Sequence, residues 1–353
     1  MIHAGRHQGN NMGEKNNNIQ IVATPCGNGI IQLKVPLPFR LDHINCYLIE
    51  GLNGFVLIDT GLNSDLSKTL WQQFLHSDYL SRPITAIVLT HLHPDHIGMS
   101  HWLQDELNIP VYLAAADIAM VRELWCADSA ASAIEFSAHW GRFGFPTDML
   151  NQLIERRASY KGLVQQLPRE LTVLDEGVID ALLGADWEMV RVPGHSAGHI
   201  CLYHRVSQSM LTGDHVLPRI TPNISLHVQG SRNPLQDYIQ SLQLVRRFEC
   251  TRYFPAHGAV GNDLHERAQE IIEHHDDKCQ QILAATDGAE TVFDFMPFLF
   301  DKAIPPHQWM FAYGETAAHL VYMVARGLLV CDGAPWCFRL PTLAANTAEV
   351  VQA

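Results

Sequence analysis

The sequence lacks several features that would point to particular classes of protein. No apolar run approaches the roughly 18 residues that a bilayer-spanning helix requires, so membrane insertion is not expected. The eight cysteines are scattered and form no Cys-x-x-Cys pair, which argues against a thiolate zinc site or a redox motif. We interpret them as free thiols in a reducing cytoplasm. Only Cys331 and Cys337, on either side of an expected hairpin turn, are close enough in sequence to suggest a disulfide.

Basic residues are scarce as well. The chain of 353 residues has 24 Lys and Arg against 37 Asp and Glu, a net charge of −13 with neutral histidine. A negative surface repels phosphodiester polymers and disfavours a nucleic-acid substrate, although a local basic groove would still permit one. Hydrophobic residues make up 47% of the chain, as expected for a globular protein with one large or two ordinary domains. Residues 1–18, rich in Gly, Asn and His, lack the apolar core of a signal peptide and predict a disordered leader.

Histidine, in contrast, is abundant, with 20 residues in the chain. Residues 90–96 read Thr-His-Leu-His-Pro-Asp-His, between a strand-like apolar run at 83–89 and a helix-like run at 98–107. Imidazole and carboxylate donors together suit zinc, with manganese or iron(II) as alternatives. A chance cluster of surface histidines is the competing interpretation, and suitable partners further along the chain disfavour it.

Three later motifs supply those partners. His195 lies on a glycine-flanked turn after a predicted strand, in Val-Pro-Gly-His-Ser-Ala-Gly-His. Asp214 ends the run Leu-Thr-Gly-Asp, and His257 ends the run Phe-Pro-Ala-His. Taken singly, each histidine would more often be a packed turn residue, and the aspartate a helix cap. Because every donor follows a predicted strand, the set predicts convergence on one edge of the sheets.

The spacing His-x-His-x-Asp-His, with the three later motifs in this order, resembles the metallo-β-lactamase superfamily of hydrolases over about residues 20 to 285. The resemblance implies an α+β fold of four layers, an αβ/βα sandwich, in a catalytic domain at 19–287. Helix-period stretches at about 115–125, 129–141 and 147–166 lie between its predicted strands and predict a helical insertion at 114–166. The resemblance also implies a first metal held by three histidines, a second held by an aspartate and two histidines, and a bridging carboxylate. The residues in that order are His91, His93 and His195; Asp95, His96 and His257; and Asp214.

Asp59 ends a predicted strand before a glycine turn and a helix-like segment. It could be a helix-entry cap, but the resemblance favours a role in accepting a ring N–H from a metal-binding histidine. We therefore count Asp59 with Asp95 among the expected catalytic residues.

The resemblance implies two zinc ions, with iron or manganese as alternatives. Metals lower the pKa of bound water to roughly 7, so a bridging hydroxide would attack a carbonyl or phosphoryl centre. A carboxylate at position 214 points away from true β-lactamases. Our first interpretation is a dinuclear hydrolase of an ester-type carbonyl, a thioester or lactone, in a small or carrier-linked substrate. The alternatives are a phosphodiesterase or endoribonuclease of the lactamase-β-like type, a mononuclear iron dioxygenase, and a non-catalytic effector, which would show eroded ligands.

Residues just beyond Asp214 are candidates for substrate binding. His215, Arg219 and His227 could all contact a substrate, and Arg219 is the expected anion contact unless it forms a structural salt bridge. The helical insertion predicts either a lid over the site or a packing pair of helices that could mediate a homodimer. Its aromatic residues would line the pocket in the first case and fill a core or interface in the second; they are Trp140, Phe143 and Phe145.

Residues 288–353 differ in pattern from the rest of the chain. Helix-like runs at 293–300 and 313–326 precede an expected hairpin at 327–340, the order of a winged-helix module. The run Gly-Glu-Thr-Ala-Ala-His-Leu at 314–320 resembles the C-terminal winged-helix extension of lactamase-β-like hydrolases. Because its only basic residues are Lys302, Arg326 and Arg339, a packing module is favoured over a DNA reader.

Overall fold

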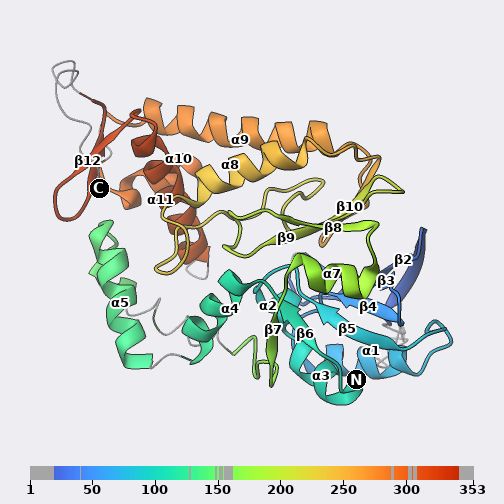
Figure 1. Cartoon of the computed structure of the whole chain (residues 1–353). Coiled ribbons are helices and arrows are strands. Elements are labelled where there is room, and N and C mark those ends of the chain that lie inside the picture. Colours follow the sequence, from blue (N-terminus) through green and yellow to red (C-terminus); the bar gives the residue numbers. More distant parts are fainter. Residues whose placement is uncertain are drawn as a thin grey trace, which may run out of the picture.

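The computed structural model places two β-sheets face to face between two layers of helices (Figure 1). It describes residues 20–39, 41–126, 129–147, 149–150, 154, 162–287, 290–300, 304 and 308–341. The predicted leader and most of the third predicted insertion helix, at 147–166, lie outside these residues. None of the helices in the described part of the chain is both long and apolar enough to cross a membrane.

The first sheet has seven strands in sequence order, antiparallel from β1 to β4 and parallel from β4 to β7. In the parallel half, the strands β4, β5 and β6 all have their carboxyl ends at one edge, where the chain leaves for Asp59, the histidine loop and Asp117. The strands are β1 (Val22–Gly27), β2 (Ile30–Pro36), β3 (His43–Glu50), β4 (Phe55–Ile58), β5 (Ile84–Val88), β6 (Val111–Leu113) and β7 (Leu171–Val173).

The apolar run at 19–23 predicts the first strand, but this position is wrong, because β1 begins at Val22. The strand runs on to Gly27, which pairs with Ile30 across a turn of only two residues. Those two residues, Asn28 and Gly29, both have positive φ, at 51° and 72°, as a tight hairpin turn requires. The run Cys-Gly-Asn-Gly at 26–29 predicts a turn from its composition, but its first two residues belong to the strand.

The second sheet has four strands in the order β11, β10, β9, β8. Since β9 is antiparallel to both its neighbours and β11 is parallel to β10, the strands β8, β10 and β11 point the same way. Their carboxyl ends lead to His195, Asp214 and His257, in that order. The strands are β8 (Trp187–Arg191), β9 (Ile200–His204), β10 (Ser209–Gly213) and β11 (Arg252–Pro255).

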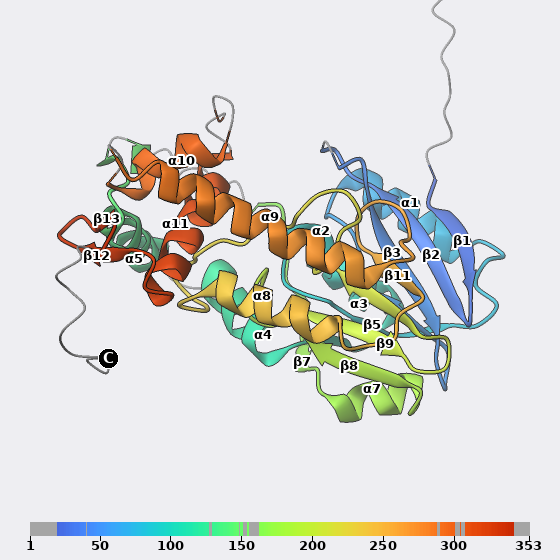
Figure 2. The same ribbon diagram turned by 90° about the horizontal axis from the view of Figure 1, so that it is seen from above.

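Three buried apolar clusters separate the four layers. Helices α1 (Asp65–Leu75) and α3 (Ser100–Leu107) cover the outer face of the first sheet, with Trp71 fully buried beneath them. Tyr47 and Phe254 meet edge to face between the two sheets. Helices α8 (Pro234–Val245) and α9 (Leu264–Ala284) lie side by side over the second sheet (Figure 2). The predicted αβ/βα sandwich is confirmed.

Sequence patterns missed the helix α7 (Glu176–Leu183), which lies between β7 and β8. It begins at Asp175, whose side chain accepts the N–H of Val178, and ends at Gly184 with φ of 89°. Both caps are ordinary signals. The short helix with Gly177 in its first turn gave too weak a periodicity to be recognised.

The insertion packs against the C-terminal part of the chain. Its described elements are α4 (Ala115–Val121), a π-helical turn (Arg122–Cys126) and α5 (Ser129–Arg142). The C-terminal part forms α10 (Val292–Leu299), α11 (Trp309–Ala325) and a hairpin of β12 (Val330–Asp332) and β13 (Cys337–Arg339). The order of helix, helix and hairpin agrees with the prediction, while the winged-helix assignment stays a prediction.

Tyr313 of α11 is the centre of this contact. Its ring lies 5.0 Å from that of Trp140 and 4.5 Å from that of Phe145, and its hydroxyl donates to the carbonyl of Phe143. All three insertion aromatics are buried, so they fill a core within the chain, the second of the two alternatives. Cys331 and Cys337 are free thiols, so the suggested disulfide is absent.

Candidate metal centre

The histidine loop leaves the carboxyl end of β5 and turns at once into the single-turn helix α2 (Pro94–Ile97). Pro94 stands at the first position of this helix, where a missing N–H costs nothing. Gly98 follows, packed so tightly against the backbone of Gly61 and Asn63 that a Cβ atom would collide with both. The turn therefore lies against the end of β4, which brings the loop to Asp59.

The structure brings all seven predicted metal donors together in two groups. Within each group one ligand atom per residue lies within 4.8 Å of the others. The grouping is the one that the resemblance implied: His91, His93, His195 and Asp214 in the first group, and Asp95, His96 and His257 in the second.

Asp214 lies between the two groups, with one carboxylate oxygen toward each. Its Oδ2 atom is 3.4 Å from Nε2 of His195 and 4.0 Å from Nε2 of His91. Its Oδ1 atom is 3.5 Å from Nε2 of both His96 and His257. This is the arrangement that a bridging carboxylate needs.

The outward-facing ring nitrogens of three histidines are anchored, which fixes the tautomers of these three rings. Nδ1 of His96 donates to Asp59, that of His195 to the carbonyl of Asn223, and that of His257 to the carbonyl of His43, at 2.8, 2.8 and 3.0 Å. A neutral ring that donates from Nδ1 presents a lone pair at Nε2.

Several inward-facing atoms have no hydrogen-bond partner. Among the described residues these buried atoms include Nε2 of His96, Nε2 of His195 and Oδ1 of Asp214. Buried polar atoms are rarely left without partners unless an ion or water satisfies them. The set of imidazole nitrogens and carboxylate oxygens therefore fits divalent cations such as zinc, and equally fits iron or manganese.

Negative charge dominates the second group. Burial alone would lower the pKa of His96, but the carboxylates of Asp59, Asp214 and Asp95 raise it well above its usual range. The carboxylates of Asp214 and Asp95 raise the pKa of His257 to about 9, although burial acts in the opposite direction. The excess of carboxylates favours a bound cation here.

Asp59 occupies the position expected of an orienting residue. Its carboxylate accepts the backbone N–H and the hydroxyl of Thr90, both at 2.8 Å, as well as Nδ1 of His96. Only 2% of Asp59 is exposed, so it holds His96 and has no access to a substrate. The helix-cap alternative is wrong, because Ser64 caps α1 by accepting the N–H of Ser67.

The three residues predicted to bind substrate differ in their exposure to solvent. Arg219 is exposed and forms no ion pair with any residue that the structure describes, so the salt-bridge alternative gains no support. His227 is partly buried near His195 and His139, and burial with these two rings lowers its pKa to about 4. His215 is fully buried with its ring against that of Tyr238. It cannot reach a substrate in this structure, and that part of the prediction is corrected.

Asp117, in the first turn of α4, was missed. Its fully buried carboxylate accepts the N–H of Leu92 at 3.0 Å and the N–H of Gly198 at 2.6 Å, so it joins the loops that carry His93 and His195. Burial raises its pKa to about 6, although these hydrogen bonds act in the opposite direction. An aspartate four residues after the end of β6, at the same sheet edge as the histidine loop, was the available signal.

His199 was missed too, although it ends the motif that contains His195. Its ring stacks on that of His91 at 4.8 Å, and its Nε2 atom accepts the backbone N–H of Asp214 at 3.1 Å. Gly213, with φ of 51°, leaves room for this ring, because a Cβ atom would lie 2.9 Å from it. His199 therefore holds the main chain of the bridging residue.

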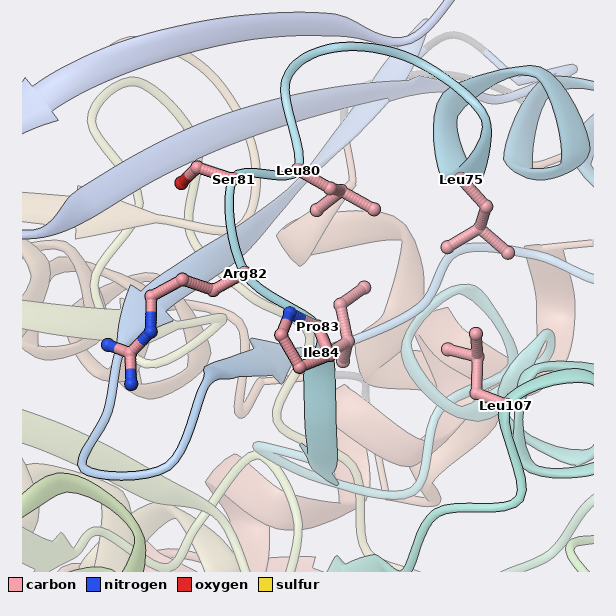
Figure 3. A pocket seen from close by; sticks show the side chains of 7 residues that line it. All are labelled: Leu75, Leu80, Ser81, Arg82, Pro83, Ile84 and Leu107. Carbon is pink, nitrogen blue, oxygen red and sulfur yellow. The ribbon is translucent and has the colours of Figure 1, made fainter.

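A pocket elsewhere on the molecule contains none of these residues. Figure 3 shows its lining around Pro83 and Ile84, at the start of β5, which is the opposite end of the strand from the histidine loop. Arg82 donates to the carbonyls of Gly51 and Leu52 there. The pocket is distinct from the candidate metal centre.

Known proteins share both the sequence pattern and the fold. A family model described as the metallo-beta-lactamase superfamily matches residues 40–257, and one for the metallo-beta-lactamase-like C-terminal domain matches 279–333. The probable metallo-hydrolase YqjP of Bacillus subtilis is 26% identical over 299 residues, 82% of this chain and 91% of the relative. The atrochrysone carboxyl ACP thioesterase of Aspergillus fumigatus is 29% identical over 258 residues, 72% of this chain and 63% of the relative.

Solved structures agree with these matches. A beta-lactamase domain protein from Burkholderia ambifaria has a TM-score of 0.79 at 27% identity, covering 90% of this chain and 94% of its own. A metallo-beta-lactamase family protein from Thermus thermophilus has a TM-score of 0.75 at 26% identity, covering 89% and 99%. Because the family model spans more than half of the chain, and relatives named a metallo-hydrolase and a thioesterase match most of its length, this chain is a hydrolase that belongs to the metallo-beta-lactamase superfamily.

Proposed function

We propose that the chain is a dinuclear metal-dependent hydrolase that cleaves a thioester or lactone carbonyl in a small or carrier-linked substrate. The observation that carries this proposal is the placement of Asp214, with one oxygen toward each group of donors. Zinc is the ion we assign to both groups, with iron and manganese as alternatives. The free thiols of the described cysteines support a reducing cytoplasm as its compartment.

The seven metal donors and Asp59 have different roles in the proposed hydrolysis. Two divalent ions, when bound, act as Lewis acids and supply a hydroxide nucleophile near neutral pH. His91, His93 and His195 would hold the first ion, Asp95, His96 and His257 would hold the second, and Asp214 would offer one carboxylate oxygen to each. Asp59 keeps the lone pair of His96 directed inward. His91 and His96 are fully buried, so the protein covers the inner side of the site.

A carrier-linked thioester is the substrate class with the most support. One relative is named a thioesterase that acts on a carrier-linked acyl group, and it covers 72% of this chain. The exposed Arg219, on the segment that follows Asp214, is suited to bind an anionic group of such a substrate. The net charge of −13 weighs against RNA, the substrate of the endoribonuclease alternative.

The metal assignment is tested by elemental analysis of the purified full chain and two variants. We expect two ions per chain in the wild type, and loss of one ion and most activity in His257→Ala and Asp95→Ala. Unchanged turnover in both variants would rule out the dinuclear mechanism. A single iron without zinc would support the dioxygenase instead.

The substrate class is tested by one panel of acyl thioesters, lactones, a chromogenic phosphodiester and RNA, each with and without a chelator. We expect chelator-sensitive cleavage of the first two classes. Cleavage confined to the phosphodiester and RNA would reverse the assignment in favour of a phosphodiesterase.

A further inference from the structure

The orientation of His195 depends on a segment without regular secondary structure. Its Nδ1 atom donates to the main-chain carbonyl of Asn223, within residues 214–233, which contain neither a helix nor a strand. In a helix or strand, backbone hydrogen bonds would fix such a carbonyl. Here, other contacts must hold it in place.

The side chain of Asn223 supplies those contacts. Its Nδ2 atom donates to Oε2 of Glu315 at 2.8 Å and to the carbonyl of Phe311 at 3.2 Å, both in α11. Its Oδ1 atom accepts the hydroxyl of Ser225. The carbonyl that meets the metal centre is therefore tied to a helix of the C-terminal part.

The backbone of the segment 214–233 also contacts the backbone of α11 directly. Leu226 donates its N–H to the carbonyl of Gly314 at 3.0 Å. A Cβ atom at Gly314 would lie 2.8 Å from the hydroxyl oxygen of Ser225, so only glycine allows α11 to approach so closely. These contacts explain the glycine and the glutamate of the Gly-Glu-Thr run, which the proposed chemistry does not use.

The burial of Glu315 costs free energy of folding. Only 9% of it is exposed, and Lys278, 3.9 Å away, is 8% exposed. Lys278 donates to the carbonyl of Leu299 and lies 4.8 Å from the centre of the Phe300 ring. Burying a carboxylate costs free energy that hydrogen bonds must offset, and a hydrogen bond to a charged acceptor is stronger than one to a neutral acceptor.

We propose that Glu315 is a positioning residue for the metal centre, acting through Asn223 on His195. It holds the amide of Asn223, so that the carbonyl of the same residue keeps Nδ1 of His195 protonated and its Nε2 directed inward. The C-terminal part thereby becomes a component of the catalytic site. This inference rests on the proposed metal-binding function of His195.

The test measures metal binding alone, with Co2+ titrated into the metal-depleted full chain and followed by visible absorption. His257→Ala serves as the parent, because the loss of a donor from the second group leaves the first to be titrated separately. Loss of an outer hydrogen-bond partner weakens metal binding by about 10- to 100-fold. In this background we expect about a tenfold higher dissociation constant for Glu315→Leu than for the parent. Glu315→Gln keeps an acceptor for Asn223 and should bind Co2+ as the parent does.

Two further variants keep the test decisive. Asn223→Ala removes the hydrogen bond to Glu315 by changing its less buried partner. It should weaken Co2+ binding as expected of Glu315→Leu, even if Glu315→Leu fails to fold. Tyr313→Phe is the matched control, because it removes one buried hydrogen bond of α11 to Phe143 and leaves Asn223 untouched. It should lower the melting temperature without changing Co2+ affinity.

The outcomes separate this inference from the proposed function. A parent that binds no Co2+ would overturn the metal site itself, and this inference with it. A parent that binds Co2+ with equal affinity in folded Glu315→Leu and Asn223→Ala would overturn the positioning role alone. An equal loss of Co2+ affinity in Tyr313→Phe would overturn it too, because it would show that metal binding depends only on the stability of α11.

Discussion

The Oδ2 atom of Asp117 lies 2.8 Å from the hydroxyl of Ser196, next to His195, although 79 positions separate the two residues in the chain. The same oxygen accepts the N–H of Leu92, between His91 and His93. One buried carboxylate thus joins a loop of the first sheet to a loop of the second. The relative position of the two loops depends on Asp117.

Asp117→Asn should therefore weaken both stability and metal binding. An amide NH2 would replace one acceptor and oppose a backbone N–H, leaving a buried donor unsatisfied at a cost of about 1–3 kcal/mol. Chemical denaturation and metal content per chain measure the two effects. Ser196→Ala, which removes only one of the three hydrogen bonds, should cost less, and equal losses in both variants would contradict the bridging role.

His199→Phe should perturb Asp214 while preserving the ring that stacks on His91. The variant leaves the backbone N–H of Asp214 without its acceptor in a buried site, which costs about 1–3 kcal/mol in the free energy of unfolding. We expect reduced metal content as well, because Asp214 faces both groups. Full metal content at unchanged stability would show that the contact with His199 does not position Asp214.

Chelation should destabilise the fold. Ions that bind only the folded state stabilise it by about 2.7 kcal/mol at a free concentration 100 times the dissociation constant. The melting temperature should therefore fall when EDTA is added, and the drop should be smaller in His257→Ala. An identical drop in both proteins would mean that His257 contributes nothing to metal binding.

Stability should decrease below pH 6.5 because of a buried histidine pair away from the metal centre. Nδ1 of His275 lies 3.0 Å from Nε2 of His319, and burial lowers the pKa of His319 from 6.5 to about 4. A depressed histidine pKa means that the unfolded state binds more protons, so stability is complete above pH 6.5 and is lost as the pH falls toward 4. The loss attributable to His319 is roughly 3 kcal/mol.

His319→Gln removes this titrating group. Denaturation midpoints between pH 4 and 7 should change less steeply in the variant than in the wild type, whatever their absolute values. Parallel pH profiles for the two proteins would assign the acid sensitivity to other residues.

Arg219→Ala should raise KM for an anionic carrier-linked thioester by about two- to fivefold, the range expected of an exposed charge contact. Neither kcat nor the melting temperature should change, because the side chain is exposed and forms no ion pair with a described residue. Arg232→Ala, at another exposed arginine of the same segment, is the matched control. Equal effects of the two variants on KM would indicate general charge attraction.

The sequence was informative where the chemistry depends on short-range spacing. The donors His91 to His96 stand within one loop, and each later donor follows an apolar strand, so their convergence could be predicted from strand ends. The four-layer fold followed from the same motifs. The predicted end of the first strand was wrong because Gly27, a residue typical of loops, pairs with Ile30 within the hairpin.

Contacts between distant parts of the chain left no such pattern. Asp117 looked like a helix residue of an insertion, and its role depends on backbone N–H groups at positions 92 and 198. Glu315 stands out in the sequence only as part of a C-terminal motif, and its contact with Asn223 spans 92 positions. Hydrophobic periodicity predicts which face of a helix is buried, but it does not identify the polar atom opposite a single carboxylate.

Each group of donors draws on both halves of the sandwich. In the first, His91 and His93 follow a strand of one sheet, while His195 and Asp214 follow strands of the other; in the second, His257 alone comes from the second sheet. Neither half alone carries a complete set, so an ion would act as a cross-link between them. Metal capture would thus be a late step of folding, and two separately produced halves of the chain should reassemble more readily when the ion is supplied.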